Sequence, residues 1–267
     1  MKPIVSSDVN LNSRRDLKNG YLSLTFGPFP RIRSIKPGQF VHIGISPSAT
    51  FYRRAYSVAG VNLESREVEL IIKVIGRGTR QLSRMRPGEN RERVNFLGPL
   101  GNPFTSPAKH QSALLVAGGV GYPPLLFLAA SLIERGHDPD RVFFLYGGKS
   151  TSDVVDRARI RNLGVNFIGA TEDGSFGRKG MITAELVKLL SSEAVVSPVI
   201  YSCGPETMLK AVDQIATEFE TPGQLALEAP MPCGIGICLG CVLPLKSGGF
   251  ARVCQEGPVF ETGTLAL

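Results

Sequence analysis

Four of the five cysteines lie close together near the end of the chain, at Cys233, Cys238, Cys241 and Cys254. Their spacing, C-x4-C-x2-C-x12-C, matches the plant-type pattern in which four thiolates hold a [2Fe–2S] cluster. Most structural zinc sites instead use paired C-x2-C units. We therefore expect these four cysteines to be ligands of iron.

The residues between the first three cysteines suit a loop that wraps a cluster. Gly234, Gly236 and Gly240 permit sharp turns, because glycine reaches positive φ without steric cost. A tight loop also directs backbone N–H groups at the sulfurs, which helps to set the reduction potential. We expect the apolar side chains of this segment to exclude water from the cysteines: Ile235, Ile237, Leu239 and Val242.

Other uses of the cysteines stay open at this point. Disulfides are rare in a reducing compartment, and the sequence shows no secretory signal that would predict an oxidising one. Structural zinc would also take four thiolates, although the glycine-rich x4 interval is unusual for it. Plain thiols are the third alternative.

Length and composition limit the number of domains and the class of protein. The chain has 267 residues, enough for two domains and an appendage, and its 43% hydrophobic and 20% charged content is typical of globular proteins. The longest apolar run, residues 123–133, is too short to cross a bilayer. We expect a cytoplasmic protein with no membrane partner.

The net charge of +7 raises the question of nucleic acid. Basic residues are scattered, however, with local density only at residues 77–93 and 157–161, and no basic helix interleaved with aromatic residues occurs. We expect no nucleic-acid partner, and anionic cofactors can use part of the charge.

The first hundred residues read as short strands separated by proline and glycine, at residues 21–26, 39–45 and 68–75. Short strands at this spacing predict a small antiparallel barrel, which we assign to residues 1–106. On a strand, Arg54 and Tyr56 would share one side of a cofactor, the guanidinium pairing a pyrophosphate and the ring stacking. An ordinary exposed strand is the alternative.

A second segment of this region could bind an anion. Gly76 and Gly78 precede a short amphipathic stretch at residues 81–85, so backbone donors at a helix start would be accessible, and Thr79 could add a hydroxyl. The alternative is a plain turn from strand to helix.

From Ser112 onward, continuous apolar strands alternate with helices, which predicts a doubly wound parallel sheet over residues 107–222. The expected strands are 113–117, 142–146, 165–170 and 199–203, and the expected helices are 123–135, 152–163, 183–191 and 205–219. Residues 223–267 then form a small cluster domain.

Ligands of such sheets bind beyond the carboxyl ends of the strands, where Gly119, Gly121 and the Cys203-Gly204 turn lie. The two glycines let a diphosphate approach the backbone, although Pro124 stands where a full G-x-G-x-x-G would have its third glycine. Instead of binding a ligand, Cys203 could equally well be a small hydrophobic residue that ends a buried strand.

Taken in order, these segments resemble the ferredoxin-reductase family. The likeness rests on Pro37-Gly-Gln-Phe40, Arg54-x-Tyr56-Ser57, Gly76-x-Gly78-Thr79, Gly98-Pro-Leu-Gly101, the turn at residues 118–121 and Cys203-Gly-Pro-Glu-Thr-Met208. It implies that Arg54, Tyr56 and Ser57 bind FAD and that Gly76, Gly78 and Thr79 cap its pyrophosphate. It also implies that Gly119 and Gly121 bind NAD, and that Cys203 and Gly204 lie beside the nicotinamide. Residues 89–93 depart from the family pattern.

Over the whole chain, the order of barrel, sheet and cysteine loop looks like the electron-transfer subunit of class 1B dihydroorotate dehydrogenase. The cysteine block, Arg252-Val-Cys254-x-x-Gly-Pro-Val-Phe260, and Thr171-Glu-Asp-Gly174 with Gly180 carry this likeness. It implies FAD, [2Fe–2S] and NAD as cofactors, and a partner catalytic subunit with FMN in a heterotetramer. The base acting on dihydroorotate would belong to that partner, since His42, His110 and His137 lie in no motif.

The three expected cofactors also fit together chemically. NAD moves electrons in pairs and an iron–sulfur cluster moves them singly, so a flavin, which does both, must stand between them. Two other functions stay open. A relative with the same cofactors could serve a hydrogenase or a ferredoxin-linked enzyme, or a degenerate scaffold could be a zinc or interaction module. Lys149-Ser150-Thr151 could also favour the 2′-phosphate of NADP.

Overall fold

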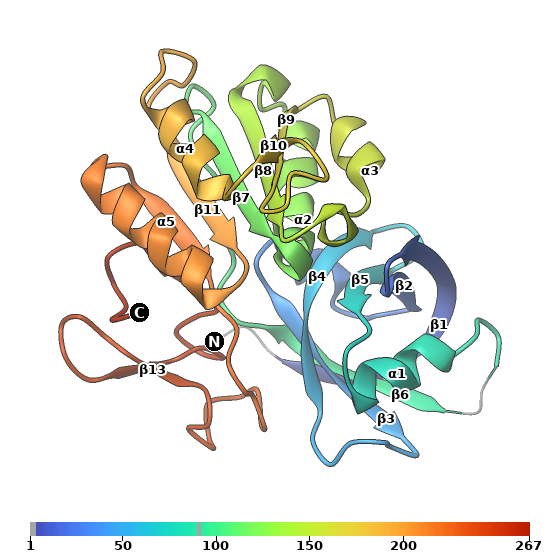
Figure 1. Ribbon diagram of the computed structural model, residues 1–267. Coiled ribbons are helices and arrows are strands. Elements are labelled where there is room, and N and C mark those ends of the chain that lie inside the picture. Colours follow the sequence, from blue (N-terminus) through green and yellow to red (C-terminus); the bar gives the residue numbers. More distant parts are fainter. Residues whose placement is uncertain (1–3, 90–91) are drawn as a thin grey trace.

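In the computed structural model, which describes residues 4–89 and 92–267, six antiparallel strands of the N-terminal part close into a barrel (Figure 1). Their order around the barrel is β1-β2-β5-β4-β3-β6. The strands are β1 (Val5–Lys18), β2 (Tyr21–Gly27), β3 (Phe40–Ser46), β4 (Arg54–Asn62), β5 (Glu67–Lys73) and β6 (Arg93–Leu100). The barrel prediction is therefore confirmed. Of the unusual segment 89–93, Asn90 and Arg91 lie outside the described residues.

The barrel forms because apolar and polar residues alternate along its strands. Leu24, Phe26, Leu70 and Phe96 point inward and are fully buried, and Leu82 of helix α1 (Arg77–Arg84) packs onto the same cluster. A short 3-10 turn, η1 (Ile32–Ser34), adds Ile32 to it. The barrel thus provides a rigid frame for side chains on its outer face.

The second part is a seven-stranded sheet in the order β10-β9-β8-β7-β11-β12-β15 within the described chain. Its strands are β7 (Ala113–Gly118), β8 (Val142–Gly148), β9 (Asn166–Thr171), β10 (Arg178–Lys179), β11 (Val199–Cys203), β12 (Gly223–Ala226) and β15 (Val259–Glu261). All neighbours are parallel except β12 and β15. The doubly wound prediction is confirmed.

Helices cover both faces of this sheet, which explains why its central strands are continuously apolar. Helices α2 (Tyr122–Glu134) and α3 (Arg157–Arg161) share one core cluster with Leu115 and Phe144. Helices α4 (Ile182–Leu190) and α5 (Glu206–Glu218) share the other with the alternate residues of β7 and β8. None of the described helices is long and apolar enough to cross a membrane.

One expected helix is largely wrong. Residues 152–163 form only the end of a 3-10 turn, η4 (Thr151–Asp153), and the short α3. A separate 3-10 turn, η3 (Pro139–Arg141), precedes β8. Val154 and Val155 are buried between the two pieces, and Asp156 has a φ of 54°, a left-handed conformation that cannot continue a right-handed helix.

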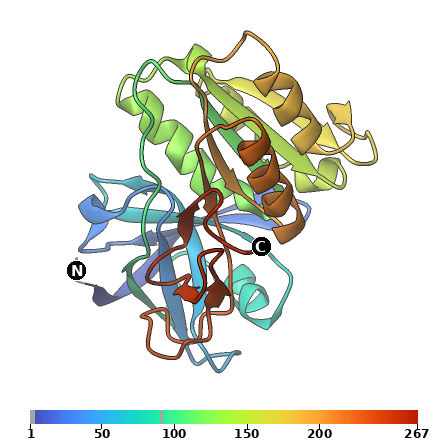
Figure 2. The ribbon, with the colours of Figure 1, turned by 90° about the vertical axis from the view of Figure 1, so that its left-hand side faces the viewer.

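The C-terminal segment runs across the side of both larger parts (Figure 2). A hairpin of β13 (Val242–Pro244) and β14 (Phe250–Arg252) follows the first three cysteines, and the chain then returns to add β15 to the large sheet. The sheet therefore continues into residues 223–267, beyond the boundary that we placed at 222. The division into three units stays a prediction.

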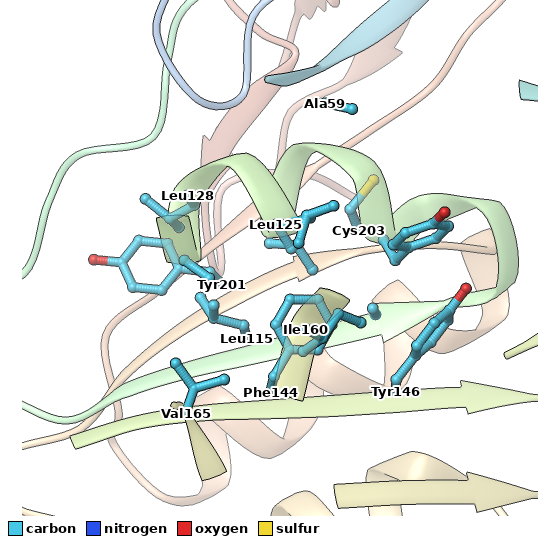
Figure 3. Packing of buried hydrophobic residues seen from close by; sticks show 14 of the residues in the cluster. Ala59, Leu115, Leu125, Leu128, Phe144, Tyr146, Ile160, Val165, Tyr201 and Cys203 are labelled. Carbon is cyan, nitrogen blue, oxygen red and sulfur yellow. The ribbon is translucent and has the colours of Figure 1, made fainter. Parts of the chain in front are cut away.

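The barrel and the sheet are packed against each other rather than merely linked. Tyr21, Ala59 and Ile71 of the barrel belong to the same buried cluster as Leu125 of α2, and Figure 3 shows Ala59 facing that helix. Phe127 of α2 in turn reaches the barrel core. The relative position of the two parts is thus fixed by apolar contact.

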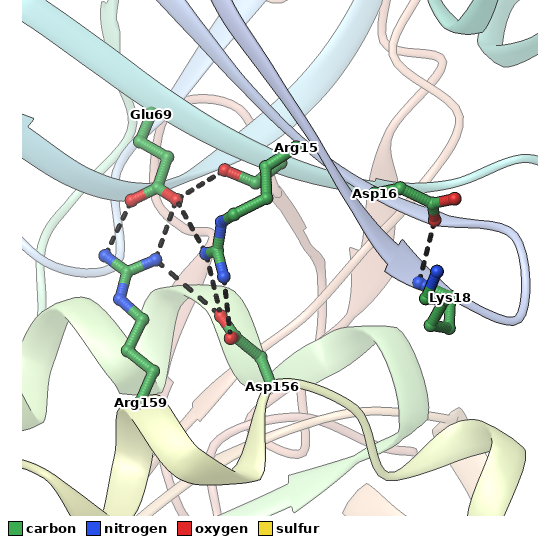
Figure 4. Close-up of polar contacts among 7 residues, drawn as sticks. Arg15, Asp16, Lys18, Glu69, Asp156 and Arg159 are labelled. Atoms are coloured by element: carbon green, nitrogen blue, oxygen red, sulfur yellow. Dashed lines mark hydrogen bonds and ion pairs between the residues drawn. The ribbon is translucent and has the colours of Figure 1, made fainter.

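An ion-pair network closes the edge of this interface (Figure 4). Both guanidinium nitrogens of Arg159 on α3 donate to the Glu69 carboxylate on β5, at 2.7 and 2.6 Å, and Ser23 donates to the same carboxylate at 2.6 Å. Arg15 on β1 pairs with Asp156 at 3.1 Å. Burial alone would raise the pKa of Glu69, but the bonds from Arg159 outweigh it and the pKa is lowered.

We predict that Glu69→Gln lowers the free energy of unfolding by about 1–3 kcal/mol at neutral pH, because it leaves Arg159 with a weaker acceptor. A carboxyl whose pKa is lowered by folding stabilises the protein above its unfolded pKa and loses that effect as the pH falls through the folded value. The difference in free energy of unfolding between Glu69→Gln and wild type should therefore shrink below about pH 4. Urea unfolding at several pH values measures it.

The matched control is Glu206→Gln, which removes an exposed pair with Lys210 and should change stability by less than about 1 kcal/mol. An equal effect of the two substitutions, or a Glu69→Gln effect that persists at low pH, would contradict the assignment of the network.

Candidate functional site

A cavity of about 900 Å³ lies where the barrel, the start of α1 and residues 227–232 meet. Its size is that of a site for a cofactor-sized ligand. Six residues predicted to bind FAD line it: Arg54, Tyr56, Ser57, Gly76, Gly78 and Thr79. The structure thus brings together two motifs that are about twenty residues apart in the sequence.

Strand β4 carries the first motif along the cavity wall. The Arg54 guanidinium is exposed, and in the described part of the chain it donates only to the backbone oxygens of Tyr52 and Arg53, at 3.3 and 3.2 Å. It is therefore available to an anion. Burial raises the pKa of Tyr56 to about 12, although Arg54 acts in the opposite direction, so the phenol stays neutral.

The start of α1 supplies the second motif. Gly76 is the residue before the helix, and a Cβ there would meet nothing within 4 Å, so the approach to the first N–H groups is open. Those groups have no acceptor inside the helix and favour an anion. The Thr79 hydroxyl accepts hydrogen bonds from the backbone of Ile75 and Gly76, at 3.0 and 3.1 Å, and so shapes this turn. These residues fit the diphosphate of a flavin dinucleotide.

The residues predicted to bind NAD lie next to one another but beside the cavity rather than in its lining. A Cβ on Gly121 would overlap the carbonyl oxygen of Cys203, and one on Gly204 would lie 3.0 Å from the backbone nitrogen of Gly118. Gly121 and Gly204 therefore let two backbone turns pack together. Gly119, with a φ of 51°, has more free space at its Cα than Gly118 or Gly121.

Cys203 ends β11 and is 3% exposed (Figure 3). Burial, with a smaller contribution from Glu228, raises the pKa of its thiol, which stays protonated. Glu228 itself lines the cavity, where desolvation by the surrounding protein raises the pKa of its carboxyl group. Sequence reasoning missed Glu228, although an acidic residue directly after an apolar strand was a signal for it.

The four predicted iron ligands come together as two pairs. The sulfurs of Cys241 and Cys254 are 3.3 Å apart, and the thiols of Cys233 and Cys238 also contact one another. All four thiols are free of disulfides. Within residues 4–89 and 92–267, no three Cys, His, Asp or Glu side chains converge as the ligands of a single ion would. Two pairs suit a cluster in which each of two irons takes two thiolates.

Backbone N–H groups of the loop point at these sulfurs, as a cluster requires. Gly236 donates to Cys254 at 3.1 Å, Gly240 to Cys238 at 3.4 Å, and Ile235 to Cys233 at 3.5 Å. Burial would raise the pKa of Cys233, but hydrogen bonds from the backbone lower it to about 6. For Cys254, burial and the neighbouring thiol raise the pKa to about 12.

The expectation that apolar side chains of the loop exclude water is wrong, because all four are exposed. Ile237 is 76% exposed and Leu239 58% exposed, whereas Ile235 and Val242 are each 37% exposed. The reason is that Cys241, Cys254 and Val253 already fill the inner side of the loop, so the other side chains point outward.

Residues 227–232 connect the cavity to the cysteine loop directly. All six line the cavity, and Cys233 is the next residue. On the other side of this segment, the Met231 carbonyl lies 2.9 Å from Nε2 of His42. His42 is a buried barrel residue, and its Nδ1 has no partner in the described chain. Burial lowers the pKa of His42, against the effect of Met231.

Comparisons with known sequences agree along the chain. Residues 228–266 match the iron-sulfur cluster binding domain of dihydroorotate dehydrogenase B, and residues 115–214 match the oxidoreductase NAD-binding domain. The electron transfer subunit of dihydroorotate dehydrogenase B (NAD(+)) from Geobacillus sp. (strain WCH70) is 40% identical over 86% of this chain and 87% of its own. The subunit from Streptococcus mutans is 34% identical over 88% and 89%.

Solved structures show the same fold. The NADH-dependent reduced ferredoxin-NADP oxidoreductase, studied for flavin-based electron bifurcation, has a TM-score of 0.82 and 25% identity over 97% of this chain and 90% of that one. A ferredoxin NADP+ reductase from Neisseria gonorrhoeae, with bound FAD and NADP, has a TM-score of 0.65 and 17% identity over 81% and 91%. The second likeness concerns the fold alone.

We predict that Gly121→Ala destabilises the protein by about 1–3 kcal/mol, because the added methyl group must push the Cys203 turn away. Gly76→Ala is the matched control, since a Cβ there meets open space. Urea unfolding of the purified chain compares them. Two equally stable variants would show that the turns are not packed as described.

Proposed function

We propose that this chain, which belongs to the family of electron transfer subunits of dihydroorotate dehydrogenase B (NAD(+)), carries electrons from the FMN of a catalytic partner to NAD+ through [2Fe–2S] and FAD. The family places it among oxidoreductases of pyrimidine biosynthesis and implies a catalytic partner subunit. The FMN of that partner, and an assembly of two copies of each chain, are our proposals.

One observation carries the electron path. The segment of residues 227–232 lines the candidate flavin cavity and leads without interruption into Cys233. A cavity wall and a cluster loop that share a backbone segment must lie close together. When bound, a flavin exchanges electron pairs with NAD and single electrons with a cluster, so it belongs at this position.

The residues of this chain then act mainly by binding and orienting. Arg54 and the first turn of α1 hold the diphosphate, and Tyr56 packs against the flavin. The turn at Gly119 and the neighbouring Cys203-Gly204 turn receive NAD, where Cys203 acts as a small neutral residue that leaves room for the nicotinamide. We assign no base to this chain; the base that acts on dihydroorotate belongs to the partner.

The exposed apolar side chains around the cysteines support docking of the catalytic subunit there. Ile237 and Leu239, which flank the exposed Cys238 in the sequence, are 76% and 58% exposed. Apolar groups gathered at one place on a surface are typical of an interaction site. Thiolate ligands also suit a reducing compartment such as the cytoplasm.

A second candidate function is the same relay serving another redox partner, such as a hydrogenase or ferredoxin-linked enzyme. The fold likeness to a ferredoxin-NADP oxidoreductase favours it. The higher identity to dihydroorotate dehydrogenase B subunits favours the first function. Purification of the tagged chain from its own cells separates the two, because the first predicts an FMN protein that oxidises dihydroorotate.

We predict that Cys238→Ser slows dihydroorotate-dependent NAD+ reduction by the complex at least about tenfold, because an iron ligand is lost. NADH oxidation with ferricyanide, which needs only the flavin, should be retained. Cys203→Ser is the matched control for iron content alone, because Cys203 is not a predicted iron ligand but lies at the proposed NAD site; that variant should keep its iron. Full dihydroorotate activity of Cys238→Ser would rule out the cluster as the path.

We also predict that Ile237→Glu weakens association with the catalytic subunit by roughly tenfold in Kd, because a carboxylate would be buried in the interface. Leu63→Glu, at a residue that directly follows β4 and is 46% exposed, should leave the affinity unchanged. Titration calorimetry of the two subunits measures both. Equal affinities would place the partner on another surface.

A further inference from the structure

His42 is a fully buried histidine that connects the flavin barrel to the cysteine loop. It lies on β3 with 0% exposure, and its Nε2 is 2.9 Å from the carbonyl oxygen of Met231. A carbonyl oxygen can only accept a hydrogen bond, so Nε2 carries the proton and donates it. The bond spans 189 positions of sequence.

The other ring nitrogen faces the loop on the far side of the first cysteine. Nδ1 is buried without a partner in the described residues, and a Cβ on Gly234 would lie 2.8 Å from it. Gly234 also has a φ of 70°, which favours glycine. Only glycine therefore lets the loop backbone lie against the ring. His42 touches the residues on both sides of Pro232 and Cys233.

The backbone of His42 is itself held firmly. β3 is paired on both edges, so that His42 lies opposite Ala55 of β4 and Leu97 of β6. Arg53 donates to the carbonyl oxygens of His42 and Asn95, both at 3.1 Å. Because Arg54 follows Arg53 on the cavity wall, the strands that would hold the flavin also carry the anchor of the loop.

We infer that His42 is a positioning residue for electron exchange between the flavin and the cluster. Its hydrogen bond to Met231 fixes the loop, and hence Cys233, at a set distance from the cavity wall. Electron exchange slows steeply as two redox centres move apart, so a loose loop would slow this step alone. The inference rests on the proposed function.

The test uses the complete chain with its cofactors and three variants. His42→Gln can place an amide N–H where Nε2 donates, whereas the shorter His42→Asn cannot reach Met231. His137→Asn is the matched control, because His137 is 4% exposed and its Nε2 also bonds a backbone carbonyl, that of Gln111 at 3.1 Å. It lies beside the large sheet, away from the cavity.

Each protein is mixed with NADH without oxygen in a stopped-flow instrument. NADH gives two electrons to the flavin as hydride, and the cluster then accepts one of them. Flavin bleaching and cluster reduction are followed separately, and the reduced cluster is examined by electron paramagnetic resonance. For His42→Asn we expect unchanged flavin bleaching, cluster reduction slowed roughly tenfold and an altered cluster spectrum. His42→Gln and His137→Asn should behave as wild type.

Two outcomes would overturn the inference: wild-type cluster reduction in His42→Asn, or a His42→Gln variant as slow as His42→Asn. If His42→Asn does not retain flavin, the His42→Gln variant alone decides. Slowed cluster reduction in His42→Gln refutes the role of the hydrogen bond to Met231, and a wild-type rate of cluster reduction supports that role. Failure of the proposed electron path from cluster to flavin looks different, because the wild-type chain would then have no cluster to reduce.

Discussion

The structure depends on one constraint, that the wall of the cofactor cavity and the start of the cysteine loop are the same short segment. Residues 227–232 follow β12 of the large sheet, line the cavity and lead directly into Cys233. The chain then turns through the loop and returns to the sheet as β15, where Leu227 donates to the carbonyl oxygen of Pro258 at 2.9 Å. The cysteine loop is thus held at both ends by the sheet.

The packing of the barrel against the sheet serves the same constraint. The cavity includes residues of β4 and α1 on one side, and Val120 of the glycine turn and Pro123 of α2 on the other. Its shape therefore depends on the apolar contact between Leu125 and the barrel, and on the Glu69–Arg159 pair that closes the interface. Buried apolar area supplies the attraction, and the ion pairs make one relative orientation specific.

Much of this arrangement could be predicted from the sequence. The cysteine spacing indicated the cluster ligands, and the change from short strands to alternating apolar strands and helices indicated both larger parts. The sequence could not show that residues 223–226 and 259–261 join the large sheet, because strand pairing between distant segments leaves no local pattern. It also hid the role of Glu228 in the cavity wall and the contact of His42 with the cysteine loop, because both depend on tertiary structure. The helix expected at residues 152–163 is interrupted because Asp156 adopts a left-handed conformation. The periodic pattern of apolar residues in this segment gives no sign of that conformation.

The central claim is that one chain holds both a flavin and a two-iron cluster. The most direct test is the visible absorption spectrum of the chain purified without oxygen, with flavin and iron quantified on the same sample. The account predicts a brown-yellow protein with one FAD and about two irons per chain. A yellow protein without iron, or a colourless one that contains zinc, would contradict it.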